Sequence, residues 1–153
     1  MPSGTGIGDL LGQAIHSATV VPRLYAAAIK AGLGPSAAFE VLRISEAALR
    51  TAAAQGRGVP GRTNALRHFM WQAVLTARFG VDAARVLAAA QEVGTPSRKD
   101  SSVDVNNNAV GQAYGAAHAT DLKTGSPSEV MARLAPVALE KWESDELIWV
   151  QPH

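Results

Sequence analysis

Residues 63–78 read TNALRHFMWQAVLTAR, a run in which apolar side chains recur on most sides of the helix that it would form. Its large apolar members are Leu66, Phe69, Met70, Val74 and Leu75. A helix that is apolar almost all round is buried among other elements. We therefore expect an all-α protein, a compact bundle of about six helices around a central helix near 63–78.

The period of 3.6 residues continues on both sides of this segment. Before it, the pattern predicts a helix over about 9–30 and another over 35–55. After it, the pattern predicts helices over 82–92 and 104–121, and a last helix beginning at 127. No segment alternates as a half-buried strand would, so the prediction contains no sheet.

A few residues mark the expected ends of these helices. Gly80 should stop the central helix, and Asp104 should cap the fifth helix. Residues 126–129 (SPSE) form a capping box with proline at the first helical position. Pro136 should kink the last helix or end it early. Between the fourth and fifth helices, residues 98–100 (RKD) are expected to lie in an exposed polar loop.

The composition excludes several classes of protein. Fourteen basic and thirteen acidic residues leave a net charge of +1, so nucleic acid is not an expected partner. Without cysteine there is no disulfide, thiolate zinc site or thiol nucleophile. The sequence contains no apolar run long enough to span a membrane. It also has no positively charged region before Arg23 with which a signal peptide would begin. We expect one soluble domain over 1–153 with a docked tail at 142–153. The alternative is export as an effector without a conventional signal.

Four side chains interrupt the apolar pattern of the central helix. Asn64, Arg67, His68 and Trp71 are spaced i, i+3, i+4 and i+7, which places them on one stripe. An unpaired buried amide or hydroxyl costs about 1–3 kcal/mol, and a guanidinium costs more. These groups must therefore meet hydrogen-bond partners or a polar cavity. A satisfied buried network and an active site both meet that requirement.

A second stripe lies on the helix expected over 104–121. It comprises Asp104, Asn107, Asn108, Gly111, Gly115 and His118. Glycine inside a helix costs about 0.5–1 kcal/mol relative to alanine, so Gly111 and Gly115 indicate close approach of another backbone or of a ligand. Asp104 alone would be an ordinary cap, but three successive asparagines exceed what one cap needs. The two stripes define a motif-bearing region at 63–118.

Glu92 ends the fourth expected helix, just before the segment that leads to Asp104. The two carboxylates are therefore candidates to converge on one pocket. Carboxylates with asparagine carbonyl oxygens suit Mg²⁺ or Ca²⁺, and His68 would be a further ligand or a general base. The spacing is not diagnostic, because single acidic residues are commonly solvated surface groups.

The same residues resemble a known pattern. NALRHFMW at 64–71, QE at 91–92 and DVNNNAVG at 104–111 resemble an uncharacterised bacterial domain found at the C-terminal ends of Rhs-repeat and other polymorphic toxins. Its pattern reads N-A-x-R-H-x-x-W, then H-E, then D-x-x-N-N-x-x-G. Gln91 departs from the histidine of this pattern, and Gln112 departs from an arginine that is common there. The first departure puts catalysis in doubt if that histidine is a ligand or base.

The resemblance implies a toxin-like setting without naming a substrate. Our leading hypothesis is a hydrolase, metal-assisted or not, that acts on a phosphate ester or a lipid-linked phosphate, with an immunity or carrier protein as a partner. Its expected catalytic residues are His68, Arg67, Glu92 and Asp104, the two carboxylates being the metal ligands. Its expected substrate-binding residues are Asn64, Trp71, Gln91, Asn107, Asn108, Gly111 and His118. The alternative is a non-enzymatic helical interaction domain whose polar stripe is a structural network.

Overall fold

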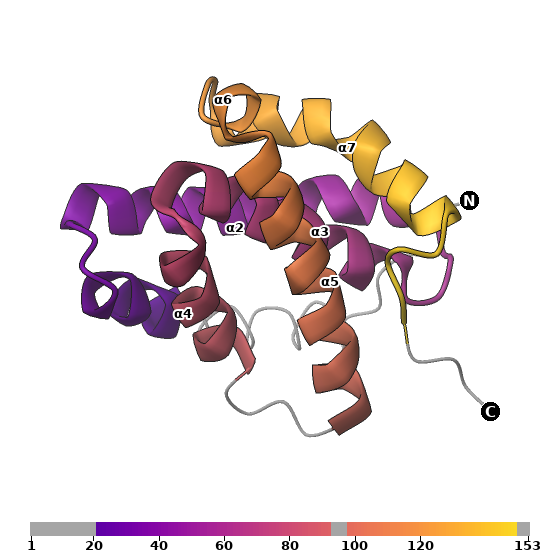
Figure 1. The fold of residues 1–153 in the computed structure, drawn as a ribbon, viewed down its shortest axis with the longest axis horizontal. Coiled ribbons are helices and arrows are strands. Elements are labelled where there is room, and N and C mark those ends of the chain that lie inside the picture. Colours follow the sequence, from indigo (N-terminus) through magenta and orange to yellow (C-terminus); the bar gives the residue numbers. More distant parts are fainter. Residues whose placement is uncertain (1–20, 93–97, 150–153) are drawn as a thin grey trace, which may run out of the picture.

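A computed structural model describes residues 21–92 and 98–149, and all of their regular structure is helical (Figure 1). Residues 21–30 form a first helical segment. The later helices are α2 (Pro35–Gly56), α3 (Arg62–Phe79), α4 (Val81–Glu92), α5 (Arg98–Ala117), α6 (Ala119–Leu122) and α7 (Pro127–Glu143). The all-α prediction is therefore confirmed. The part of the first predicted helix before residue 21 lies outside the described residues.

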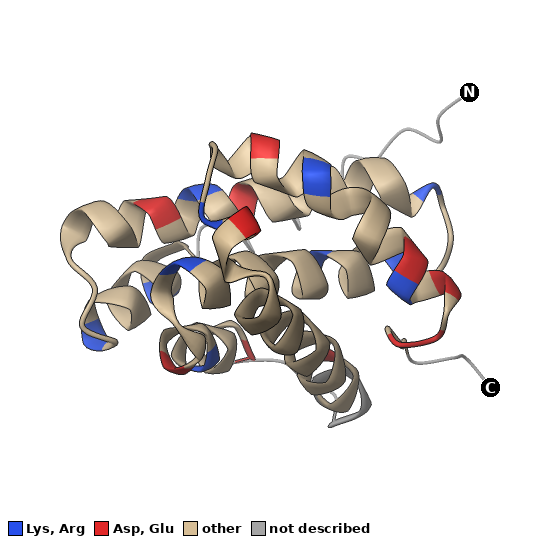
Figure 2. Ribbon diagram, turned by 45° about the horizontal axis from the view of Figure 1, so that its top comes forward, with Lys and Arg blue, Asp and Glu red and all other residues tan. Residues whose placement is uncertain are grey.

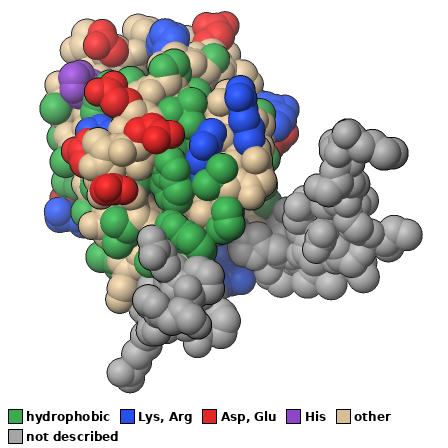
Figure 3. All heavy atoms as spheres, turned by 90° about the vertical axis from the view of Figure 1, so that its right-hand side faces the viewer, with side chains coloured by type: hydrophobic (Ala, Val, Ile, Leu, Met, Phe, Trp, Pro, Cys, Tyr) green, Lys and Arg blue, Asp and Glu red, His purple; other side chains and the backbone are tan. Residues whose placement is uncertain are grey.

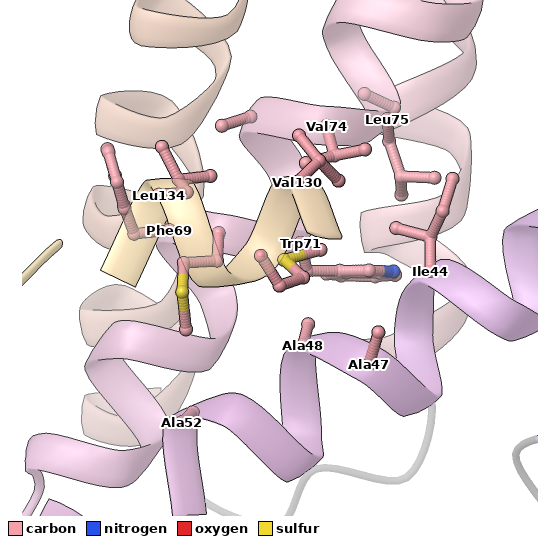
Figure 4. Packing of buried hydrophobic residues seen from close by; sticks show 14 of the residues in the cluster. Ile44, Ala47, Ala48, Ala52, Phe69, Trp71, Val74, Leu75, Val130 and Leu134 are labelled. Carbon is pink, nitrogen blue, oxygen red and sulfur yellow. The ribbon is translucent and has the colours of Figure 1, made fainter. Parts of the chain in front are cut away.

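Helix α3 occupies the centre of the bundle. It packs against α2, α4, α5, α6 and α7, and its longest contact is with α5. The side chains of Leu66, Phe69, Met70 and Val74 are fully buried. Figure 4 shows Phe69 beside Leu134 of α7, with the core continuing across α3 to α2. The expected burial of this helix is confirmed.

Most helix ends follow the local sequence signals. Gly80 adopts a positive φ of 91° after α3, and its N–H donates to the Thr76 carbonyl. Ser126 caps α7 by accepting a hydrogen bond from the Glu129 N–H. Pro35 and Pro127 occupy first-turn positions, where a missing N–H removes no helical hydrogen bond.

Two predictions about the helix ends are wrong. Helix α5 begins at Arg98, so Asp104 lies in its second turn rather than at its cap. Residues 98–100 accordingly belong to a helix and not to a loop. Of the two effects predicted for Pro136, an early end of the last helix is excluded, because α7 continues past the exposed Pro136 to Glu143.

Helices α3 and α5 approach most closely at two glycines. A Cβ atom on Gly111 would lie 2.5 Å from the Phe69 carbonyl oxygen and 3.2 Å from the Ala73 nitrogen. A Cβ on Gly115 would collide with the Ala73 carbonyl group. The glycines therefore remove side chains where two helix backbones meet, as the sequence indicated.

The segment after α7 returns to α5 and docks there. Asn107 accepts a hydrogen bond from the Ile148 N–H at 2.9 Å and donates one to the Ile148 carbonyl at 2.8 Å. Leu147 is buried, and Trp149 packs directly on Gly61 at the start of α3. The predicted tail thus contacts α5 and the start of α3 through Ile148 and Trp149, whereas residues 150–153 lie outside the described part.

Charges of both signs are spread over the helices. Figure 2 shows basic and acidic residues interspersed along the ribbon, and Figure 3 shows both signs on either side of an apolar strip. Neither view presents a continuous basic surface. Within 21–92 and 98–149, no helix combines the length and hydropathy that a membrane span requires.

Candidate active site

His68 stands at the centre of a polar cluster between α3 and α5. Its ring is 1% exposed, and Nδ1 lies 2.8 Å from Oδ1 of Asn108. Because the asparagine offers a carbonyl oxygen, Nδ1 carries the proton and donates it. The lone pair of Nε2 then accepts from Nη2 of Arg67 at 3.3 Å, and Oδ1 of Asp104 lies at the same distance from Nε2 without a hydrogen bond to the neutral ring.

Asn64 and Arg67 close this cluster at the N-terminal end of α3. Asn64 donates to Oδ1 of Asp104 at 2.9 Å, and Arg67 donates to Oδ1 of Asn64 at 3.3 Å. The stripe predicted on α3 and the first half of the stripe on α5 are thus joined by hydrogen bonds. Asp104 and Asn108 are almost fully buried, so the cluster is built into the interface.

The environment keeps His68 neutral. Burial is the largest effect and lowers the pKa of His68 to about 4, helped by the positive charge of Arg67 and opposed by Asp104 and the hydrogen bond to Asn108. Burial also lowers the pKa of Arg67, while Asp104 and Glu92 act in the opposite direction. Arg67 nevertheless stays protonated near pH 7, because guanidinium pKa values start above 12.

Glu92 completes a group of possible metal ligands. One ligand atom from each of His68, Glu92 and Asp104 lies within 4.8 Å of the others. This spacing and the nitrogen-and-oxygen donor set suit a divalent cation. Arg67, however, presents its guanidinium to the same lone pair of His68. A cation that used Nε2 would therefore have to displace Arg67 from its present hydrogen bond.

An apolar cavity of about 390 Å³ opens beside this cluster. Its apolar walls are Val21, Leu24, Phe39, Leu42, Leu49 and Trp71. Its polar lining consists of Arg43, Ser45, Glu46, Arg67, His68 and Gln91. Trp71 is fixed there by its indole N–H, which donates to Oγ of Ser45 at 2.8 Å. The volume lies within the range of about 300–1,000 Å³ that is common for ligand pockets.

A second cavity of about 410 Å³ lies on the other side of Arg67. It is walled by the loop between α2 and α3 and by the first turn of α3, with Leu49, Gly58, Val59, Gly61, Thr63 and Asn64 as lining residues besides Arg67. Arg67 and Leu49 line both cavities. The guanidinium therefore stands at the junction of an apolar cavity and a loop-walled one.

The structure separates three predicted substrate-binding residues from this cluster. Asn107 holds the tail through Ile148, and Gly111 packs on the backbone of α3. His118 is exposed and stacks on Tyr114, with ring centroids 4.1 Å apart. It lies ten residues beyond Asn108, or about 15 Å along a helix. The remaining predicted residues belong to the cluster or line its cavities.

Sequence reasoning missed the contribution of α2. Arg43, Ser45 and Glu46 reach the cavity from a helix that carried no recognised motif. The one available signal was Ser45, a hydroxyl within the apolar stripe of α2, which accepts from Trp71 and donates to the Val41 carbonyl. It also missed the buried pair in which Gln112 donates to Oε1 of Gln72 at 2.7 Å.

Fold and site together define an all-α domain with a histidine-centred polar cluster between its two most closely packed helices. The chain belongs to the family described as Domain of unknown function (DUF6973), whose model matches residues 31–139. The match includes every residue of the cluster. Comparisons with curated proteins and with solved structures gave no match.

Proposed function

We propose that this domain is a hydrolase of phosphate esters, lipid-linked phosphates included, with His68 as its acid and base. The observation that carries the proposal is the position of Nε2 of His68. Nε2 lies 3.3 Å from both the Arg67 guanidinium and the Asp104 carboxylate, and His68 is one of the residues that line a cavity. Perturbed titratable groups at a cavity are more frequent at functional sites than elsewhere.

In the proposed reaction, Arg67 turns from Nε2 to the phosphoryl oxygens of the substrate, for which its planar fork is suited. A water molecule then gives a proton to Nε2 as its oxygen forms a bond to phosphorus. The ester P–O bond breaks, and the leaving oxygen takes the proton back from Nε2. Asn108 accepts from Nδ1 throughout, and Asp104 stabilises the transient imidazolium.

Movement of Arg67 also improves His68 as a base. Its positive charge is the second largest cause of the lowered pKa of His68. When the guanidinium pairs with phosphate, that cause is offset, and the pKa rises toward the range near 7 in which general bases work best. Substrate binding would thus activate the base.

A divalent cation fits the same residues in the metal-assisted version of the proposal. Glu92 and Asp104 would hold Mg²⁺ or Ca²⁺, with His68 as base or third ligand. The bound cation would polarise a phosphoryl oxygen. Arg67 would then bind phosphate rather than Nε2.

The competing function is a non-enzymatic interaction domain. Its supporting observation is that Asn64, Arg67, His68, Asp104 and Asn108 are already joined to one another by hydrogen bonds. A network of this kind also fixes the register of two helices. Gln91, at the position of the histidine in the resembled pattern, favours this alternative.

We also propose a toxin-like role, with an immunity or carrier protein as partner, on the basis of the motif resemblance. Production of the domain inside bacteria should arrest growth, and His68→Ala should relieve the arrest. Unimpaired growth with the soluble parent protein at a comparable level would contradict this role.

The hydrolase is tested by incubating the purified chain with phosphate monoesters and diesters, with Mg²⁺, Ca²⁺ or Mn²⁺ or with chelator. We expect release of alcohol by the parent protein and loss of at least about 100-fold in Asp104→Asn, as for a missing catalytic group. Asn106→Ala is the matched control, because the Asn106 side chain donates to Asn107 and to the Glu146 carbonyl of the tail. Equal turnover by Asp104→Asn would refute the assigned role of Asp104.

A further inference from the structure

The two cavities beside Arg67 differ in chemistry. The first cavity offers Phe39, Leu42 and Trp71 as walls, whereas the loop-walled cavity has a mixed lining in which Thr63 and Asn64 stand beside Leu49, Val59 and two glycines. A ligand that fills both would have an apolar part and a polar part. The atoms that join those parts would lie at Arg67, within reach of the cluster around His68.

The apolar cavity is large enough to take a hydrocarbon chain and is partly open to solvent. Phe39 and Leu49 are 54% and 42% exposed although both are large apolar residues. Exposed apolar side chains that gather around a cavity indicate a binding surface more than scattered ones do. Its volume, about 390 Å³, is near the lower limit for ligand pockets and favours one chain over two.

Charge at the cavity favours an anion. Arg43 and Arg67 both line it. The single carboxylate in the lining, Glu46, forms an ion pair with Arg50. Arg43 is exposed and pairs with no acidic side chain among the described residues. Asp104 and Glu92 lie outside the lining and act on Arg67, so Arg43 is the cation of the lining that no described carboxylate offsets, and it favours an anionic head group.

We infer that the site takes a single-chain amphiphile with an anionic phosphate head group, its chain between α2 and the helical segment 21–30 and its phosphate on Arg67. This inference rests on the proposed function for what happens to the phosphate ester, but the binding it describes does not require turnover. A polar substituent on the phosphate would extend into the loop-walled cavity.

The test is isothermal titration calorimetry of the full chain with n-dodecyl phosphate, below its micelle concentration. Inorganic phosphate and the uncharged n-dodecyl maltoside are the comparison probes. We expect one n-dodecyl phosphate to bind per protein molecule, with a negative heat-capacity change from burial of its hydrocarbon chain. Its affinity should be at least about tenfold above that of either comparison probe. Equal affinity for inorganic phosphate would show that the hydrocarbon chain adds nothing to binding and would exclude the proposed site for it. Equal affinity for the maltoside would exclude head-group recognition, and no saturable binding would overturn the inference.

Two matched variants test whether the hydrocarbon chain of the ligand lies in the apolar cavity. Phe39→Glu places a carboxylate in the apolar lining and should weaken binding by about tenfold or more, because the charge must be desolvated and repels phosphate. Val105→Glu makes the same change at a 62% exposed position of α5 outside the lining and should leave affinity unchanged. Equal effects of the two variants would overturn the proposed position.

His68→Gln separates binding from hydrolysis. It should retain affinity for n-dodecyl phosphate, because the chain and Arg67 supply the contacts, while turnover of esters is lost. Binding by the parent protein without any turnover supports the amphiphile site and contradicts the hydrolase. Turnover of short, chain-free esters at the same rate as of dodecyl esters contradicts the amphiphile as substrate and leaves the hydrolase standing.

Discussion

The two halves of α5 meet α3 in opposite ways. In the first half, Asp104 and Asn108 place carboxylate and amide groups between the helices, and these bind His68 and Asn64. In the second half, Gly111 and Gly115 bring backbone against backbone. One stripe of residues thus holds a polar cluster at one end and closes the interface at the other.

This difference teaches how the polar cluster is kept in place. His68, Asp104 and Asn108 are buried between the helices, and such polar groups are costly unless their partners are fixed, because each unpaired group loses about 1–3 kcal/mol. The glycine contact has few alternative arrangements, since any sliding of α5 brings backbone atoms into collision. We conclude that the closed half sets the register in which the polar half is satisfied.

The largest expected effect is on the polar half, through pH. The folded-state pKa of His68 is about 4, below the ordinary value of 6.5. Between these pH values the unfolded chain binds a proton at His68 that the folded chain does not bind. The free energy of unfolding therefore falls as the pH decreases from 6.5 to 4, and the contribution of His68 is fully present above pH 6.5. The loss amounts to about 3 kcal/mol over this window.

Urea unfolding of the parent and of His68→Gln at pH 7 and pH 4.5 measures this effect. The fall in the free energy of unfolding should be larger for the parent, because other titrating groups are common to both proteins. Parallel losses in the two proteins would mean that His68 is not buried in its neutral form.

The next effect concerns the closed half. Gly115→Ala adds a methyl group where the Ala73 carbonyl lies and should destabilise the protein by about 1–3 kcal/mol. The sign of the change in the free energy of unfolding is informative, because alanine otherwise stabilises a helix by about 1 kcal/mol relative to glycine. Thermal unfolding of Gly115→Ala checks this prediction. Ala113→Gly, at an exposed position of the same helix, measures the difference in helix propensity between alanine and glycine. A more stable Gly115→Ala would show that the helices are not in contact there.

The smallest effect lies at the outer edge of the polar half. Asn107→Ala removes two hydrogen bonds to Ile148, whose groups water can then reach, so we expect a loss of about 1 kcal/mol. Amide hydrogen exchange should show faster exchange at Ile148. Asn106→Ala, which loses a 3.2 Å bond to the Glu146 carbonyl, should change exchange at Ile148 less. Equal effects would remove Asn107 from its role as the anchor of the tail.

The helices were largely predictable because their signals are local. Gly80 and the box at 126–129 act within one turn of the chain, and both ends came out as expected. Asp104 was misassigned because an aspartate before an apolar run looks the same at a cap as in a second turn. The start of α5 at Arg98, six residues earlier, distinguishes the two cases.

The site was predictable only where its members share a helix. The spacing of Asn64, Arg67 and His68 identified one wall, and that of Asp104 and Asn108 identified the other. Ser45 contributes from 26 residues away, and the binding of Ile148 by Asn107 spans 41 residues. Contacts of that range have no periodic signature, so the sequence indicated a pocket and a docked tail but neither the α2 side of the cavity nor the role of Asn107 as tail anchor.

The central claim is that the cluster around His68 exists for chemistry rather than for stability. Asp104→Asn tests it most directly, because the amide keeps the shape of the carboxylate and an oxygen for Asn64 while removing the charge. The measurement is the melting temperature of Asp104→Asn beside its rate of phosphate ester hydrolysis, with the parent chain as reference. We predict a free energy of unfolding within about 1 kcal/mol of the parent and a rate lower by at least about 100-fold. A melting temperature several degrees lower, as about 1–3 kcal/mol implies, together with no measurable hydrolysis by the parent, would contradict the account and establish a structural network.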